Sequence, residues 1–415
     1  MHPLVRRLGP LSAMAIGLSA MIGGGVFYVW SPAARAAGPW LLLALVIAAI
    51  VATLNALSTA QLAMAYPVAG GAYTFARSTL SEAWGFAAGV LFLLGKTASA
   101  AAIAVIVGGY LWPGHARLIA VAAVLVLVTV NVLGIRSTAR VSFVVTGLVI
   151  AVLLCLLVAV AVAGSGCGAH ALEAPDAASP LGVVQAAGLI FFSFAGYARI
   201  ATLAEEVRVP RRTIPRAIIG ALSITLVLYT AVAAACLLVL GPASLAKSAS
   251  PVAALASDAL GGDGWTILVA VTAAVAGCGS LLGVLAGLSR TALAMARDRE
   301  LPTVLGRISA RTHAPVIAEC VIGALALLGA LLLDPQVLVG FSATTVLGYY
   351  LIAHVAASRQ RGADRWLPRW LPWLGAAGCA VLALTLPWPG VLAAVLALGA
   401  AFAARAVRRR SGRPQ

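Results

Sequence analysis

Charged residues are scarce in this chain of 415 amino acids. Only 10% of the residues are charged, whereas 62% are hydrophobic, and the mean hydropathy is +1.05. A soluble globular domain carries about 25% charged residues, because charge has to cover its surface. The shortage therefore excludes a water-soluble enzyme. The high hydrophobic content excludes an intrinsically disordered chain.

Motifs for metal binding, catalysis and nucleotide binding are also lacking. The six cysteines stand singly, without a Cys-x-x-Cys pair, which predicts small apolar side chains in packed helices rather than metal ligands. There is no His-Glu-x-x-His sequence and no phosphate-binding Gly-x-x-x-x-Gly-Lys-Ser/Thr sequence. We therefore expect no metal and no cofactor. A membrane-embedded enzyme and an ATP-driven pump are both disfavoured.

Long apolar segments fill nearly the whole chain, and the first is too rich in glycine for a cleavable signal peptide. A membrane-spanning helix needs about 20 apolar residues. We predict twelve spans, at 11–33, 39–64, 84–112, 117–134, 141–163, 183–204, 214–240, 264–294, 315–333, 336–357, 371–386 and 389–405. Tryptophans near the span ends agree with these limits. The predicted fold class is all-α, a polytopic membrane protein with a single membrane domain.

Basic residues gather on one side of these spans. With an even number of spans both termini share a side. Of the 28 basic residues, 23 arginines lie on that side, Lys96 and Arg199 lie within spans, and three lie on the other side: Arg35, Arg117 and Lys247. Cytoplasmic loops carry an excess of Lys and Arg, so we expect cytoplasmic termini and a location in the cell membrane. The net charge of +16 then reflects topology and contact with the lipid bilayer, not a nucleic acid partner.

Two spans contain sequences that disfavour a continuous helix. The first holds the consecutive glycines Gly23, Gly24 and Gly25, each costing about 1 kcal/mol relative to Ala in a helix. The sixth holds a Ser-Phe-Ala-Gly sequence at 193–196. Unwound backbone within a membrane is tolerated where it is buried in protein or lines a cavity, although glycines also permit close helix packing. We expect helices 1 and 6 to be broken.

The sixth span begins a second set of five spans. An inverted repeat of five plus five spans, with broken first helices, places a substrate site at the interface between the repeats. We predict a first repeat at 1–163, a second at 183–357, and two extra C-terminal helices at 371–405. Amides at a half-helix N-terminus bind a carboxylate and opened carbonyls bind an ammonium, a combination that suits an amino acid.

Four segments carry a resemblance to a known family: Ile22–Phe27, Tyr66–Tyr73, Phe191–Gly196 with the following Pro210–Pro215, and Arg290–Pro302. In this order they resemble the amino acid–polyamine–organocation (APC) superfamily, close to its bacterial amino acid permeases. The resemblance covers essentially the whole chain. It implies a secondary transporter for an amino acid that works by alternating access and is not an enzyme.

The same resemblance implies positions for the substrate. It places the carboxylate on the three glycines of the first span and the ammonium on carbonyls of spans 1 and 6. The implied substrate-binding residues are Met21, Gly23, Gly24, Gly25, Phe192, Ser193, Ala195 and Ser280, and the implied aromatic gate is Phe194 or Tyr197.

Lys96 lies near the middle of the third span, where a charged side chain costs at least ~2.5–3.5 kcal/mol on insertion scales. We predict a role in coupling or selectivity, with an opened carbonyl of span 1 or 6 as its partner. The alternative is a structural ammonium that caps helix carbonyls. The cationic amino acid transporters of the family have a lysine in span 5, where this chain has Val149. The glutamate that some antiporters keep after the break is Ala198. We find no sodium site and favour proton coupling or exchange.

Several alternatives stay open at this stage. An amino acid exporter or a polyamine carrier fits the same motifs, and a channel or receptor is disfavoured by the paired breaks. We expect Asn55 and Gln61 to form interhelical hydrogen bonds and Glu319 to be an interfacial carboxylate. The loop from Glu205 to Arg216 is expected either to form ion pairs of a cytoplasmic gate or to be a solvated loop. The oligomeric state is not predicted.

Overall fold

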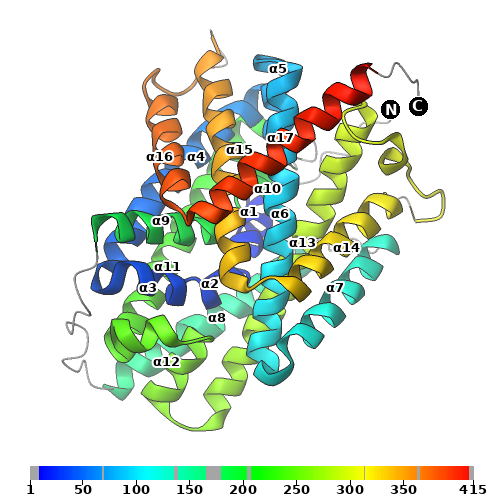
Figure 1. Ribbon diagram of the computed structural model, residues 1–415. Helices are drawn as coiled ribbons and strands as arrows, with labels where there is room; N and C mark the ends of the chain where they lie inside the picture. The colour runs from blue at the N-terminus through cyan, green and yellow to red at the C-terminus, as the bar shows by residue number, and fades with distance from the viewer. Residues whose placement is uncertain are drawn as a thin grey trace.

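The computed structural model describes residues 9–67, 70–134, 139–164, 179–202, 207–312, 314–361 and 365–410, and these contain helices but no β-strand. Figure 1 shows the helices as one compact bundle. They are α1 (Pro10–Met21), α2 (Gly24–Tyr28), α3 (Trp30–Ala37), α4 (Leu41–Ala65), α5 (Ala72–Thr79), α6 (Glu82–Leu111), α7 (Ala116–Val132), α8 (Ala139–Ala163), α9 (Pro180–Phe194), α10 (Ala198–Thr202), α11 (Pro210–Lys247), α12 (Pro251–Leu260), α13 (Asp263–Arg297), α14 (Val316–Leu332), α15 (Pro335–Arg359), α16 (Leu371–Thr385) and α17 (Trp388–Arg410).

Every predicted span coincides with one helix or with a broken helix. Ten helical segments of the described chain are long and apolar enough to cross a bilayer. The remaining two, α14 and α16, have 17 and 15 residues and are shorter than a full span. The prediction of an all-α, multi-pass membrane protein is confirmed. The short helices α5 and α12 were not predicted, because neither is long enough to give a span-length apolar run.

Both predicted helix breaks are present. The first span stops at Met21 and resumes at Gly24, and the sixth stops at Phe194 and resumes at Ala198. Figure 1 places α1, α2 and α10 in the middle of the molecule. Around them, α1 contacts α8, α11 and α13, while α10 contacts α4 and α11. The broken helices therefore lie inside the bundle, away from lipid, as unwound backbone requires.

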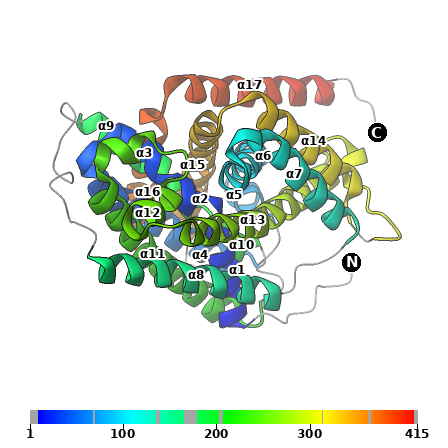
Figure 2. The ribbon, with the colours of Figure 1, turned by 90° about the horizontal axis from the view of Figure 1, so that it is seen from below.

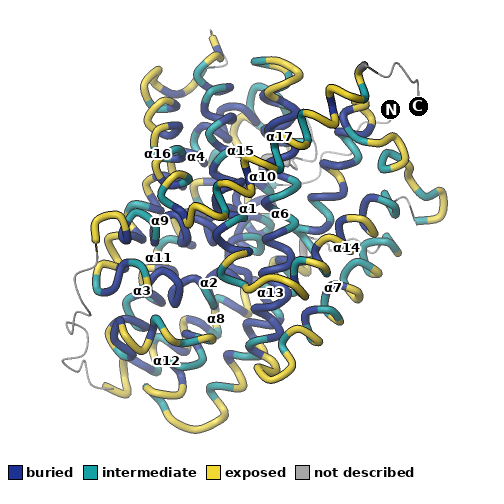
Figure 3. The backbone as a smooth tube through the Cα atoms, in the orientation of Figure 1, coloured by how far each residue is buried: buried dark blue, intermediate teal, exposed yellow. Residues whose placement is uncertain are grey.

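Burial separates inner helices from outer ones. In α6 and α15, 78% of the most apolar stretch is buried within the protein, against 11% in α7 and α17. Figure 3 shows the same contrast, with exposed backbone concentrated on the outer helices. Viewed from below, α8 and α17 lie along opposite edges of the bundle (Figure 2). The outer helices expose leucine and valine side chains, which a bilayer solvates without cost.

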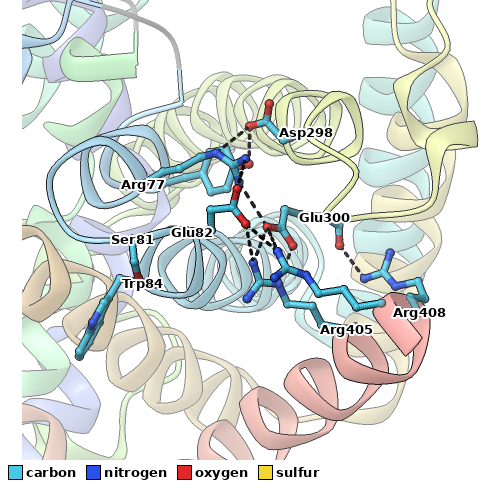
Figure 4. Close-up of polar contacts among 10 residues, drawn as sticks. Arg77, Ser81, Glu82, Trp84, Asp298, Glu300, Arg405 and Arg408 are labelled. Carbon is cyan, nitrogen blue, oxygen red and sulfur yellow. Dashed lines mark hydrogen bonds and ion pairs between the residues drawn. The ribbon is translucent and has the colours of Figure 1, made fainter. Parts of the chain in front are cut away.

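One end of the bundle is held together by a network of ion pairs (Figure 4). Arg405 of α17 donates to the carboxylate of Glu300 through Nε at 2.7 Å and through Nη2 at 2.5 Å. Arg77 of α5 lies 3.2 Å from Glu300 and 3.3 Å from Glu82, at the start of α6. The side chains of Glu300 and Arg405 are only 3% and 9% exposed, so this bidentate pair is largely removed from water. It fastens α17 to the ends of α5, α6 and α13.

Tyr73 of α5 extends the same network. Its hydroxyl donates to Asp298 Oδ2 at 2.5 Å. Burial, together with this hydrogen bond, raises the pKa of the Tyr73 hydroxyl, so it remains a donor at neutral pH. The network thus ties two segments that the sequence resemblance singled out, at 66–73 and 290–302.

Candidate functional site

The break in the first span is centred on Gly23. The amide of Ile22 still donates to Leu18 at 2.7 Å, but the amide of Gly23 turns back to Met21 at 2.9 Å. Gly23 itself has φ −113° and ψ −148°, outside the helical region. Helix resumes at Gly24, and Val29 joins α2 to α3 with helical angles of φ −60° and ψ −23°. The first amides of this helix therefore lie at the break without intrahelical partners.

Each glycine of the triplet approaches a different helix. A methyl group added to Gly23 would lie 2.5 Å from Cβ of Ser280 on α13, and one added to Gly25 would lie 2.5 Å from Oγ of Ser193 on α9. At Gly24 the nearest atom, 3.3 Å away, belongs to Ile103 of α6. The triplet thus lets the backbone of the first span approach α9 and α13 more closely than any larger residue allows.

The break in the sixth span lies next to the break in the first. The amide of Ala195 reaches only Phe192 O, at 3.4 Å, and helical bonding restarts where Arg199 N donates to Gly196 O at 3.0 Å. A methyl group on Gly196 would lie 2.3 Å from the carbonyl carbon of Ala20. The break in the sixth span therefore packs directly on the backbone of the last turn of α1, next to the break in the first span.

A small cavity of about 20 Å³ lies between the two breaks. That volume holds about one water molecule, so it is too small for an amino acid. Seven of the predicted site residues line the cavity: Met21, Gly23, Gly25, Lys96, Phe192, Ser193 and Ser280. Its other described lining residues are Ala20, Ser99, Ile103, Gly196 and Val284. Four predicted residues are not among the described lining residues: Gly24, Phe194, Ala195 and Tyr197.

Lys96 reaches the break in the sixth span. Its Nζ donates to the carbonyl oxygen of Ala195 at 3.2 Å, across 99 residues of sequence. The predicted contact with an opened carbonyl is confirmed. None of the ion pairs found among the described residues involves this ammonium, so a backbone dipole is its principal partner. Its function stays a prediction.

Sequence reasoning missed two tyrosines that bind the opened carbonyls. The hydroxyl of Tyr229, on α11, lies 2.7 Å from Met21 O and 3.2 Å from Ser193 O, and so bridges the two breaks. The hydroxyl of Tyr350, on α15, lies 3.5 Å from Ala195 O. A tyrosine hydroxyl within a membrane has to find an acceptor, and the breaks supply carbonyls that no helix uses. The sequence therefore indicates that tyrosines within a span need acceptors, but it does not show which tyrosines reach the breaks.

Three of the carbonyls of spans 1 and 6 are therefore already in use. Those of Met21, Ser193 and Ala195 accept from tyrosine or lysine side chains. The hydroxyl of Ser193 is different, because this buried Oγ has no hydrogen-bond partner among the described residues. It is a free polar group on the cavity wall.

The two aromatic rings expected to form a gate are packed into the core. Phe194 contacts the ring of Tyr229, with centroids 5.0 Å apart, and Tyr197 stacks on Tyr350 at 5.3 Å. Both rings are fully buried. They support the walls of the closed site, and their gating role stays a prediction.

The predicted interhelical hydrogen bonds are confirmed. Gln61 of α4 donates to Gln360 Oε1 at 2.7 Å, and Asn55 Oδ1 is in hydrogen-bond contact with His354 of α15. Glu319 lies in the first turn of α14, near the helix end as expected, but it is buried and accepts from Ser289 at 2.7 Å. The prediction of an interfacial carboxylate missed this burial, because the sequence does not show which face of α14 packs against α13.

A larger cavity, of about 390 Å³, shares no described lining residue with the site. It lies at the ends of α4 and α11 and is lined by Met64, Ala65, Arg211, Arg212, Pro215, Arg216 and Trp366. Its arginines make it unsuited to an ammonium group. Glu205 and Glu206, the expected partners in a gate, lie outside the described residues.

Comparison with known proteins identifies relatives over nearly the full length. Residues 8–405 match the family described as "Amino acid permease". An uncharacterized transporter of Mycobacterium tuberculosis is 49% identical over 98% of this chain and 92% of its own. A branched-chain amino acid permease of Bacillus subtilis is 29% identical over 93% of this chain and 89% of its own. A vacuolar cationic amino acid transporter of Arabidopsis thaliana is 33% identical over 85% of this chain and 59% of its own.

Proposed function

Since this chain belongs to the amino acid permease family, we propose that it is a secondary transporter that carries an amino acid across the cytoplasmic membrane by alternating access. Membership makes it a multi-pass membrane transporter and not an enzyme. The observation that carries the proposal is the meeting of two broken helices at one cavity, which offers amides and carbonyls to a zwitterion.

The carboxylate of the substrate binds at the start of α2. Gly24 and Gly25 are the first helical residues there, so their amides have no acceptor within the helix. The positive end of the helix dipole adds to the attraction, because α2 continues into α3. Ser193 and Ser280 stand opposite the glycines and supply hydroxyl groups.

The ammonium of the substrate binds the opened carbonyls. In the closed site these carbonyls accept from Tyr229 and Lys96. The incoming ammonium shares or replaces those donors as the cavity widens. A cavity that holds one water has to open before an amino acid enters, which fits a carrier rather than a permanently open channel.

Opening follows from motion of one repeat against the other. We assign the repeats to 1–163 and 183–357, with the helices of 371–405 outside them, and both termini to the cytoplasm. The breaks in α1–α2 and α9–α10 then lie at the repeat interface. Phe194 and Tyr197 follow the second break and form the gate.

The substrate is neutral or anionic if Lys96 is charged. A cationic side chain at ~5 Å from its ammonium, at an effective dielectric constant of about 20, is repelled by roughly 3 kcal/mol, which is over a hundredfold in affinity. Among the relatives, the branched-chain permease therefore suggests the substrate class better than the cationic transporter does. A polyamine carrier is disfavoured on the same ground.

Coupling to protons, or exchange of one substrate for another, fits this chain better than coupling to sodium. The fifth span offers Thr146 and Val149, with no acidic or basic side chain. Export remains the alternative to uptake, because alternating access is reversible and the gradients set its direction.

Counterflow in proteoliposomes tests the proposal. Vesicles loaded with one unlabelled amino acid are given a trace of the same labelled amino acid, for each of the twenty in turn. A neutral or acidic amino acid is expected to drive accumulation of label, and lysine and arginine are not. Vesicles without protein and vesicles with Gly25→Val are the controls. If none of the twenty drives counterflow, the proposal is wrong.

A further inference from the structure

A column of buried polar side chains leads away from the break in the sixth span. Ala195 O lies 3.5 Å from the hydroxyl of Tyr350, whose ring stacks on Tyr197 at 5.3 Å. The hydroxyl of Tyr197 is close enough to the side chain of Asn55 to interact with it. Asn55, on α4, is in turn in hydrogen-bond contact with His354 of α15. These contacts thus link the substrate site to His354, which lies within the predicted span 336–357.

Buried polar atoms without hydrogen-bond partners are concentrated along this column. Eleven buried side-chain nitrogen or oxygen atoms of the described residues have no hydrogen-bond partner, and five of them belong to α4, to α15 or to the residue that caps α15: Asn55 Nδ2, Ser58 Oγ, Thr59 Oγ1, His354 Nδ1 and Gln360 Nε2. Buried polar atoms in proteins are nearly always paired. Their concentration along the inner face of α4 and α15 indicates a route along which protons or water pass.

The imidazole of His354 is held by close packing and by a polar contact. The ring lies against Gly375 of α16, where an added methyl group would overlap it. Its Nε2 contacts Asn55 Oδ1, which also accepts from Cys379 Sγ at 3.1 Å. Because a carboxamide oxygen only accepts, Nε2 carries the hydrogen. Nδ1 is left with a lone pair that can take a proton.

We propose that His354 is the group through which this transporter exchanges its coupled proton with the cytoplasm, along the column of polar side chains on α4 and α15. The proposal rests on the proton coupling proposed above. Nδ1, whose lone pair has no partner among the described residues, takes up a proton that enters from the substrate side and becomes N–H, so the ring is transiently an imidazolium. It gives that proton up toward Thr59 and Gln360, near the ends of α4 and α15. The imidazole returns to neutral, and one proton has crossed.

Burial of the imidazole explains how protonation of His354 is coupled to a conformational change. The neighbours of the ring among the described residues are Asn55 of α4 and Gly375 of α16, and Cys379 of α16 shares the Asn55 oxygen with it; the tyrosines at 197 and 350 lie next to Asn55 and Cys379. None of them carries a charge at neutral pH, so nothing in the closed site stabilises an imidazolium. Protonation therefore favours a conformation that hydrates the ring. Tyr197 and Tyr350 transmit that change to the break, where Ala195 O also holds Lys96.

The test measures proton movement and amino acid movement separately. Proteoliposomes containing a pH dye, with the membrane voltage clamped by potassium and valinomycin, receive an equimolar mixture of the twenty amino acids. The parent protein is expected to acidify the interior. His354→Gln is expected to lose most of this acidification while it retains counterflow. His115→Gln, the same change at an exposed histidine, is the matched control and is expected to acidify like the parent.

A second variant tests the inference independently, in case His354→Gln does not fold. Asn55→Asp keeps the size of the side chain and places a carboxylate beside the ring. A carboxylate favours the imidazolium, so the pH midpoint of acidification is expected to rise by about one unit or more. A purely structural role for His354 predicts no such shift.

The possible failures are distinguishable. Counterflow without acidification in the parent overturns proton coupling and this inference, and leaves amino acid transport standing. Acidification by His354→Gln equal to that of the parent, or an unchanged midpoint in Asn55→Asp, overturns the inference alone. Absence of counterflow in the parent overturns the proposed function, and the inference with it.

Discussion

A graded set of alanine substitutions in the glycine triplet tests the site most directly. In Gly25→Ala the new methyl group would lie 2.5 Å from Ser193 Oγ and 3.0 Å from its Cβ, so α2 and α9 have to separate or Ser193 has to leave the cavity wall. In Gly24→Ala the nearest atoms are the γ carbons of the Ile103 side chain, at 3.3 and 3.5 Å, which can move by a few tenths of an ångström. Adjacent residues of one helix therefore differ sharply in the space available.

The expected magnitudes follow from these contacts. Inserting a methyl group into a tightly packed position costs about 1–3 kcal/mol. If the strain falls on the substrate-binding geometry, affinity drops roughly 5- to 150-fold in Gly25→Ala. Gly24→Ala contacts a side chain that can adjust, so we expect less than about 1 kcal/mol, or under about fivefold.

The assay is the concentration dependence of counterflow, measured on protein whose elution as a single species shows that it is folded. Adding Ser193→Gly to Gly25→Ala removes the two nearest atoms, Oγ and Cβ, and the pair is expected to recover part of the lost affinity, giving a measurable coupling between the two residues. Equal affinities in Gly24→Ala and Gly25→Ala, both unchanged from the parent, would refute the reasoning.

Three further predictions concern the side chains around the site. Lys96→Met keeps the length and removes the charge, so it is expected to admit lysine and arginine with affinities up to about a hundredfold higher than in the parent; an identical substrate range and pH profile makes the lysine structural. Tyr229→Phe frees the opened carbonyls of both breaks from a hydrogen bond worth about 0.5–1.5 kcal/mol, so the half-saturation concentration in counterflow is expected to fall about 2- to 10-fold, and weaker binding would contradict this. Glu300→Gln leaves Arg405 buried without its partner and is expected to destabilise the protein by about 3 kcal/mol in thermal unfolding in detergent, with substrate preference unchanged. Glu82→Gln, at an exposed carboxylate, is its control and is expected to change stability by less than about 1 kcal/mol.

Prediction from sequence succeeded where a local rule decides the structure. The apolar runs determined where helices lie, because a bilayer accepts only helices of about 20 apolar residues or closed barrels. The glycine triplet determined the break at Gly23 in the same way. The contact of Lys96 with the sixth span was also predictable, because an intramembrane ammonium needs an acceptor and only the breaks supply free carbonyls.

Prediction failed where the partner is distant in sequence and the side chain has no distinctive pattern. Tyr229 and Met21 are 208 residues apart. An interhelical hydrogen bond of Asn55 was predicted, but its partner His354, 299 residues away, was not. Nothing in the local sequence of Tyr229 separates it from a tyrosine that faces lipid. The same holds for the burial of Glu319 and for the rings of Phe194 and Tyr197, whose neighbours come from α11 and α15.

The sequence by itself determined that this protein is an all-α membrane protein with breaks in two spans, since hydrophobic length and glycine content act through the backbone within a few residues. Only the tertiary structure decided that the breaks lie next to each other, that tyrosine hydroxyls and Lys96 bind their carbonyls, and that the cavity between them is closed to about 20 Å³. These features depend on how helices pack, and packing is determined by the shapes of side chains that meet across the bundle.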